Sequence, residues 1–121
     1  MPLTLTISAS PVQEQAGPKG LGPLTIVGAA NIEQVDVRAL ASGDNVFTVP
    51  TAPAGVVGCL IVPPTTNTFT LKLKGSAGDT GIVISKTGPT VLGFDPAALP
   101  AAIIVNSSAS FVTGQLVVNW F

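Results

Sequence analysis

The chain has 121 residues, a formal net charge of −1 and no histidine. Without histidine, the usual general base, the nucleophile pairs that depend on it and histidine metal sites are excluded. Hydrophobic residues make up 46% of the chain and charged residues only 9%, where about 25% is usual, and five basic residues are too few for phosphate-driven binding of nucleic acid.

The first predicted element is a strand at the N-terminus, where Leu3, Leu5 and Ile7 alternate with threonine and serine. Proline and glycine are then too dense for a helix or a central strand, until a short strand is predicted at residues 24–27. We therefore expect residues 1–30 to form an N-terminal strand and an extended Pro/Gly-rich arm that can cross to a neighbouring subunit.

Residues 31–121 are predicted to form one β-sandwich domain. Its clearest strand is at residues 68–74, where the odd positions are apolar and the even ones polar. Three glycines around Asp79 supply the positive-φ positions for a loop that leads into a β-branched run at residues 82–84. Similar runs recur about every ten residues, between turns rich in Gly, Pro, Asn and Asp. One such turn is expected at residues 42–45.

Helical periodicity is lacking, and residues 33–41 are the only stretch for which a helix remains an alternative. About nine or ten short strands at regular spacing favour a sandwich or a jelly roll over a large barrel. The predicted fold class is all-β, an antiparallel β-sandwich that is jelly-roll-like and carries an extended N-terminal arm.

The cysteine and the aspartates, which could still carry chemistry, are predicted to have structural roles. Cys59 lies in an apolar run expected to be buried, so we predict an inert, packed thiol. Asp44, Asp79 and Asp95 adjoin glycine or proline, where aspartate caps its own turn, which disfavours a glycosidase pair or a calcium site. We expect no catalytic residue, no cofactor and no metal, and no apolar run is long enough to span a membrane.

The high content of apolar residues and the low content of charged ones are best explained if subunits bury much of their surface against one another. We expect a homo-oligomer, with a trimer as the leading prediction. Leu3, Leu5 and Ile7 of the first strand are candidate interface residues. Trp120 and Phe121 are candidates as well, with completion of the core as the alternative for this pair.

Three segments carry a resemblance to a known group of proteins: SGDNVFTVP at residues 42–50, LIVPP at 60–64 and LKLKGSAGDTGI at 71–82. In these segments the chain resembles the small β-sandwich virion structural proteins of tailed bacteriophages. The resemblance implies a capsid cement or decoration protein that binds and stabilises the shell of the major capsid protein, made in the host bacterial cytoplasm and carried in the virion. A tail, head-fibre or other virion appendage component is the alternative. A carbohydrate-binding β-sandwich module is a third hypothesis, which the scarcity of aromatic residues disfavours.

Overall fold

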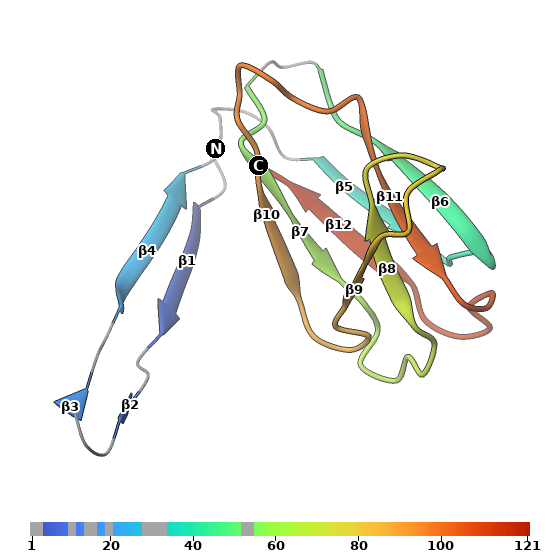
Figure 1. The fold of residues 1–121 in the computed structure, drawn as a ribbon, viewed down its shortest axis with the longest axis horizontal. Coiled ribbons are helices and arrows are strands. Elements are labelled where there is room, and N and C mark those ends of the chain that lie inside the picture. The colour runs from blue at the N-terminus through green and yellow to red at the C-terminus, as the bar shows by residue number, and fades with distance from the viewer. Residues whose placement is uncertain (1–3, 10–11, 14–16, 19–20, 28–33, 52–54) are drawn as a thin grey trace.

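The computed structural model describes residues 4–9, 12–13, 17–18, 21–27, 34–51 and 55–121. The described residues form strands, turns and loops, and none of them is helical. Figure 1 shows the strands in two groups, an N-terminal ribbon and a sandwich. The ribbon contains β1 (Thr4–Ala9), β2 (Val12–Gln13), β3 (Gly17–Pro18) and β4 (Leu21–Val27). The sandwich contains β5 (Gln34–Arg38), β6 (Gly43–Thr48), β7 (Gly58–Val62), β8 (Leu71–Lys74), β9 (Ile82–Ile84), β10 (Thr90–Gly93), β11 (Ala102–Ser107) and β12 (Leu116–Trp120).

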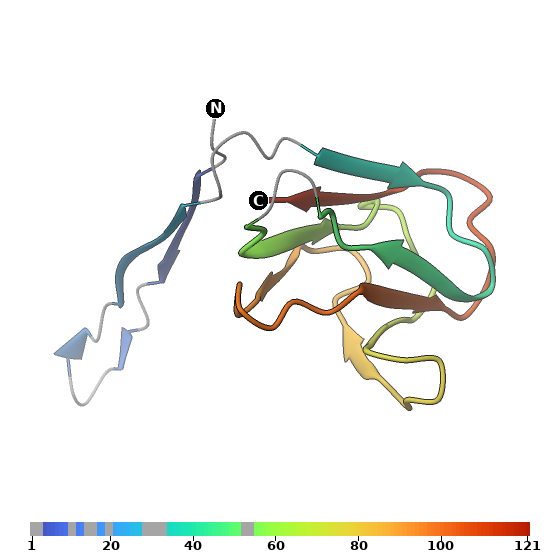
Figure 2. The ribbon, with the colours of Figure 1, turned by 90° about the horizontal axis from the view of Figure 1, so that it is seen from above.

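Two antiparallel four-stranded sheets make up the sandwich, one in the order β10-β7-β12-β5 and the other in the order β6-β11-β8-β9. The strand pairs are nested along the chain: β5 pairs with β12, β6 with β11, β7 with β10 and β8 with β9. This nesting, shared between two packed sheets, is the jelly-roll topology, and it confirms the predicted fold class. Figure 2 shows the sandwich from above. The helix alternative at residues 33–41 is wrong, because β5 lies there.

The core lies between the two sheets and is built from alternate residues of each strand. In β12, Leu116, Val118 and Trp120 are buried, and the residues between them are half-buried. The largest fully buried side chains are those of Trp120, Phe47 and Phe121. The two-residue alternation in the sequence therefore becomes an apolar layer between the sheets.

The strand predicted at residues 68–74 is β8, and it begins later than expected. Leu71 is fully buried and Leu73 packs against the core, as the alternation predicts. The residues before Leu71 are held in a turn, because Asn67 Oδ1 accepts a hydrogen bond from the N–H of Phe69 at 3.1 Å and Asn67 Nδ2 donates to the carbonyl of Phe69 at 3.0 Å. A side chain that bonds its own backbone in this way competes with the strand ladder.

The loop after β8 leads into β9, the strand predicted at residues 82–84. Of the three glycines around Asp79, only Gly81 has a positive φ, of 82°. The expectation that all three supply such positions is therefore wrong. Asp79 forms the turn instead, because its Oδ2 accepts hydrogen bonds from the N–H groups of Gly75 and Ser76 at 3.0 and 2.7 Å.

The turn predicted at residues 42–45 is also wrong, because β6 begins at Gly43. Asn45, a residue typical of turns, lies inside the strand and is 8% exposed. Its Nδ2 donates to the carbonyls of Ala41, Gly43 and Val105, and its Oδ1 accepts from the N–H of Ala41. A buried amide with its hydrogen bonds satisfied is tolerated in a strand, so the residue type alone misleads here.

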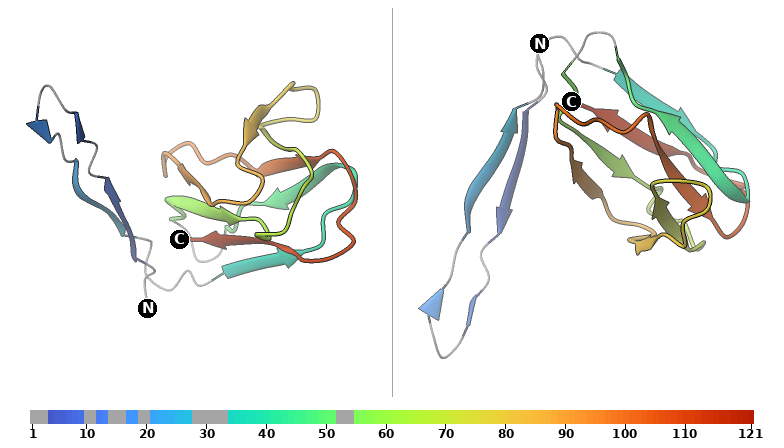
Figure 3. Two further views of the ribbon diagram at one scale, coloured as in Figure 1. Left: turned by 90° about the horizontal axis from the view of Figure 1, so that it is seen from below. Right: turned by 45° about the horizontal axis from the view of Figure 1, so that its top comes forward.

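The N-terminal ribbon is formed by β1 and β4, which pair antiparallel, and continues through the pair of β2 and β3. Leu5 is paired with Ile26, and Ile7 with Leu24. Pro23 lies within β4, which is compatible with a ribbon two strands wide because each of its strands is an edge. In the views of Figures 1 to 3 the ribbon lies outside both sheets of the sandwich.

Candidate interaction surfaces

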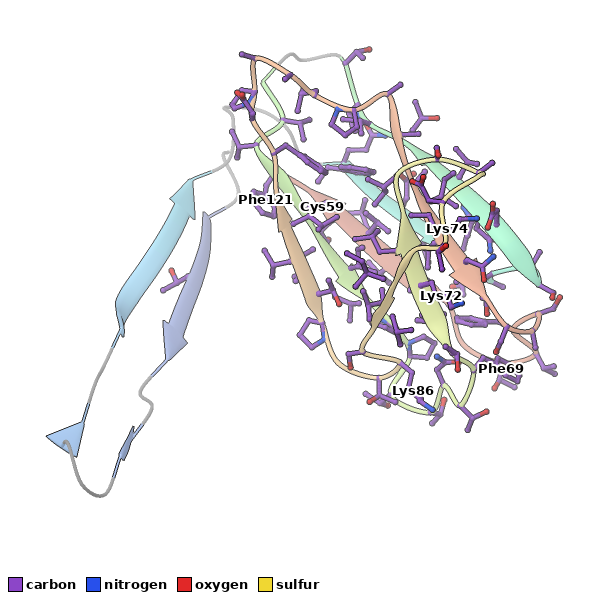
Figure 4. The ribbon with its side chains drawn as sticks, in the orientation of Figure 1. Cys59, Phe69, Lys72, Lys74, Lys86 and Phe121 are labelled. Carbon is purple, nitrogen blue, oxygen red and sulfur yellow. The ribbon has the colours of Figure 1, made fainter. Side chains whose placement is uncertain are left out.

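The outer face of the sheet β6-β11-β8-β9 carries charged residues. Lys74 Nζ donates to both carboxylate oxygens of Asp44, at 2.9 and 3.0 Å, and Asn106 Nδ2 donates to Asp44 Oδ1 at 2.6 Å. These hydrogen bonds, the one from Asn106 first, lower the pKa of Asp44 from its ordinary value. Figure 4 shows Lys72 and Lys74 along β8. This face therefore combines charged and polar residues with two exposed valines, Val46 and Val83, which are 50% and 63% exposed.

Two of the three carboxylates predicted to cap their own turns do so. Asp79 caps the loop after β8, and Asp95 Oδ1 accepts a hydrogen bond from the N–H of Ala97 at 2.9 Å. For Asp44 the prediction is wrong, because this residue lies in β6 and its partners come from β8 and β11. Within the described ranges, no three Asp, Glu, Cys or His residues are grouped as a metal ion would require.

Cys59 lies on the inner face of β7 and is fully buried, as the sequence predicts. Burial raises the pKa of its thiol to about 12, so the thiol stays protonated near neutral pH. A buried, protonated thiol is a poor nucleophile. The geometry therefore gives Cys59 a packing role.

We expect Cys59 to react with a disulfide reagent at about pH 8 only after denaturant is added, because reagent and thiolate cannot meet in the folded core. The thiol pKa is raised in the folded state, so the unfolded chain ionises first, and the free energy of unfolding should fall as pH rises from 9.0 towards about 12. A Cys59→Val variant should lose this pH dependence. Labelling of the folded protein as fast as of the unfolded chain would contradict the assignment.

The predicted interface residues lie in different parts of the structure. Trp120 and Phe121 are 1% and 0% exposed. Trp120 belongs to the core between the sheets, and the ring of Phe121 packs beside Gly58 at the start of β7. Figure 4 shows Phe121 close to Cys59 at one end of the sandwich. Leu3 lies outside the described residues. Leu5 and Ile7 belong to β1, and their place in an interface stays a prediction.

The outer face of the sheet β10-β7-β12-β5 is apolar, which the sequence analysis missed. The residues that alternate with the buried ones, and so face outward, are Val35, Val37, Leu60, Val62, Val91, Val117 and Asn119. We call these residues the valine face. Val35 and Val37 are 51% and 50% exposed, and the others are half-buried. No charged residue belongs to this face, and Asn119 is its one polar member, so the part that meets water is mostly apolar.

This outer face lacks charge partly because the charged residues of strand β5 point inward. Asp36 Oδ2 accepts a hydrogen bond from Trp120 Nε1 at 2.8 Å. The guanidinium carbon of Arg38 lies 4.1 Å from the ring centroid of Phe47, and Arg38 Nη1 donates to the carbonyl of Val46 at 2.8 Å. Antiparallel sheets usually place apolar residues inward and polar residues outward. The edge strand β5 reverses this rule and leaves its valines outside.

A second apolar surface lies between the two sheets, at the side of β9 and β10. It is an open groove of about 260 Å³. Most of its lining is aliphatic or aromatic, with Lys74 the charged exception: Leu73, Lys74, Gly75, Ile82, Leu92, Phe94, Pro100, Ala102 and Ile103. The opposite side of the sandwich is bridged by Arg38 of β5, which reaches Val46 of β6. The jelly roll is therefore bridged at one side and open at the other.

None of the six aromatic residues, all of which lie in the described part of the chain, is an exposed side chain: Phe47, Phe69, Phe94, Phe111, Trp120 and Phe121. Phe94 stacks on Trp120 with ring centroids 6.4 Å apart, and Phe69 packs near Phe111 at 6.2 Å. The aromatic residues therefore contribute to packing and supply no flat exposed platform.

The described residues contain no helix long and apolar enough to cross a membrane. No protein-family model, no curated protein and no solved structure matches this chain.

Proposed function

We propose that this chain is a non-enzymatic structural protein of a bacteriophage virion, a cement or decoration subunit that binds and stabilises the shell of the major capsid protein. The observation that carries the proposal is the valine face. An outer sheet face of this kind is a surface that needs a partner. The jelly roll supports the proposal weakly, since it is common in capsid proteins but also serves many other functions.

The physical logic of a cement protein fits this surface. Permanent contacts between proteins are more apolar than transient ones, and their buried centres are poor in charge. Because the valine face carries no charged residue, its burial leaves no unpaired charge and its attraction is not screened by salt. Such a contact holds neighbouring capsid subunits together by hydrophobic burial.

The two alternatives differ in how well the surfaces support them. A tail or head-fibre component would use an apolar sheet face in the same way, so it remains the second candidate. Carbohydrate recognition is less well supported, because none of the aromatic residues is an exposed side chain on which a sugar ring could stack.

The test is the location and copy number of the protein in purified virions. Heads and tails are separated on a gradient, and the chain is quantified in each fraction by mass spectrometry against the major capsid protein. We expect it in the heads, in a number comparable to that of the capsid protein, and still bound in high salt. A few copies confined to the tails would favour the appendage alternative, and absence from virions would overturn the proposal.

A further inference from the structure

The backbone register of the N-terminal ribbon gives four apolar residues positions that share one face. Because Leu5 is paired with Ile26 and Ile7 with Leu24, strand alternation places these four residues on one face of the ribbon. Strands β1 and β4 contain no charged residue. A two-stranded ribbon is at best marginally stable alone in water, so its apolar face needs a cover.

We propose that the ribbon of one copy of this chain docks on the valine face of a second copy. Both surfaces are uncharged and, apart from Asn119 on the valine face, apolar, so their contact removes apolar area from water without burying a charge. The outer face of the other sheet is a poor match, because covering it would desolvate the ion pair of Lys74 and Asp44.

The dimensions of the two surfaces agree. Strands rise about 3.3 Å per residue and lie about 4.8 Å apart, so the ribbon of β1 and β4 measures about 20 by 10 Å. The valine face, with five-residue strands in a four-stranded sheet, measures about 16 by 19 Å. The ribbon therefore covers about half of that face. The half along β5 is favoured, because Val35 and Val37 are its most exposed members. The half along β7 and β10 is then left for the capsid protein.

A second copy is the favoured occupant for two reasons. In both views of Figure 3 the ribbon stands off the sheets of its own chain. Each chain also offers one ribbon and one valine face, so two copies that exchange ribbons about a two-fold axis, or more copies around a higher rotation axis, satisfy every ribbon and every face. Every subunit of such an oligomer donates one ribbon and receives another. Each subunit therefore buries two such contacts, where a single ribbon contact would bury one.

The first test compares two variants of the full-length chain, Val37→Glu and Val46→Glu. The two valines are both 50% exposed, but Val37 lies on the valine face and Val46 on the outer face of the other sheet. By light scattering over a range of concentrations, we expect the parent and Val46→Glu to be oligomers and Val37→Glu to be a monomer. An unchanged mass for Val37→Glu, or a monomeric parent at all concentrations, would overturn the proposal. Circular dichroism and cooperative unfolding show whether Val37→Glu is still folded, and Val35→Glu replaces it if it is not.

The second test mixes Val37→Glu, which keeps its ribbon, with Ile7→Glu, which keeps its valine face. We expect each variant alone to be monomeric and the equimolar mixture to form a 1:1 heterodimer, because one productive contact survives. If the mixture does not associate, the ribbon and the valine face do not bind each other between chains, and the proposal is wrong. A ribbon that docks on the valine face of its own chain would give this same result. No capsid takes part, so the result is independent of the proposed virion function.

Discussion

Replacing Leu71 by aspartate is expected to abolish stable folding or to lower the melting temperature by at least about 12 °C. Leu71 is fully buried in β8, within the core between the two sheets. A carboxylate there loses its hydration and gains no partner, which costs about 4 kcal/mol or more. That is a large part of the roughly 5–15 kcal/mol by which a domain is stable. Thermal unfolding followed by circular dichroism measures the effect.

Lys72→Asp is the matched control, because it introduces the same side chain at the next position of β8, on the opposite face of the sheet. Its effect should stay within about 1 kcal/mol. If Leu71→Asp melted at the temperature of the parent, the inward register of β8 would be wrong.

Gly58→Ala should destabilise the sandwich by about 2–3 kcal/mol. A methyl group at this position would overlap the backbone carbonyl oxygen of Leu92 and lie 2.9 Å from two ring carbons of Phe121. The backbone there is also fixed, since the N–H of Gly58 donates to the carbonyl of Phe121 and the N–H of Phe121 donates back to the carbonyl of Gly58. The carbonyl of Leu92 belongs to the pair of β7 and β10, so it cannot move away without disturbing that pair, and the ring of Phe121 would have to shift as well.

Gly93→Ala is the control, because Gly93 stands directly opposite Gly58 in the pair of β7 and β10. A methyl group on Gly93 would meet no atom within 4 Å. The change should be neutral or slightly stabilising, since alanine loses less chain entropy than glycine. Denaturant unfolding measures the free energy of unfolding of both variants. Equal values would show that the close packing at Gly58 does not contribute to stability.

The fold class could be predicted because alternation and turn residues are local signals. The order of the strands could not. β5 and β12 are the first and last strands of the sandwich, and nothing in their sequences marks them as neighbours. Any two strands with one apolar face are compatible in principle, so the choice among pairings depends on how all the side chains fill the core.

The valine face was missed for a related reason. The alternation of Val35 and Val37 with Asp36 and Arg38 predicts a strand, but it does not say which side is buried. The usual rule would bury the valines. The structure turns the other side inward, where Asp36 accepts a hydrogen bond from the Trp120 indole and Arg38 lies over the ring of Phe47. Those partners are distant in sequence, so only the fold reveals the reversal.

The nested strand order also determines when the sandwich can form. β5 has a single neighbour in its sheet, and that neighbour is β12, the strand farthest from it along the chain. Pairings between such distant segments raise the contact order and slow folding. The sheet that carries the valine face therefore stays incomplete until the last strand has been synthesised, and the chain must fold late and cooperatively instead of growing strand by strand.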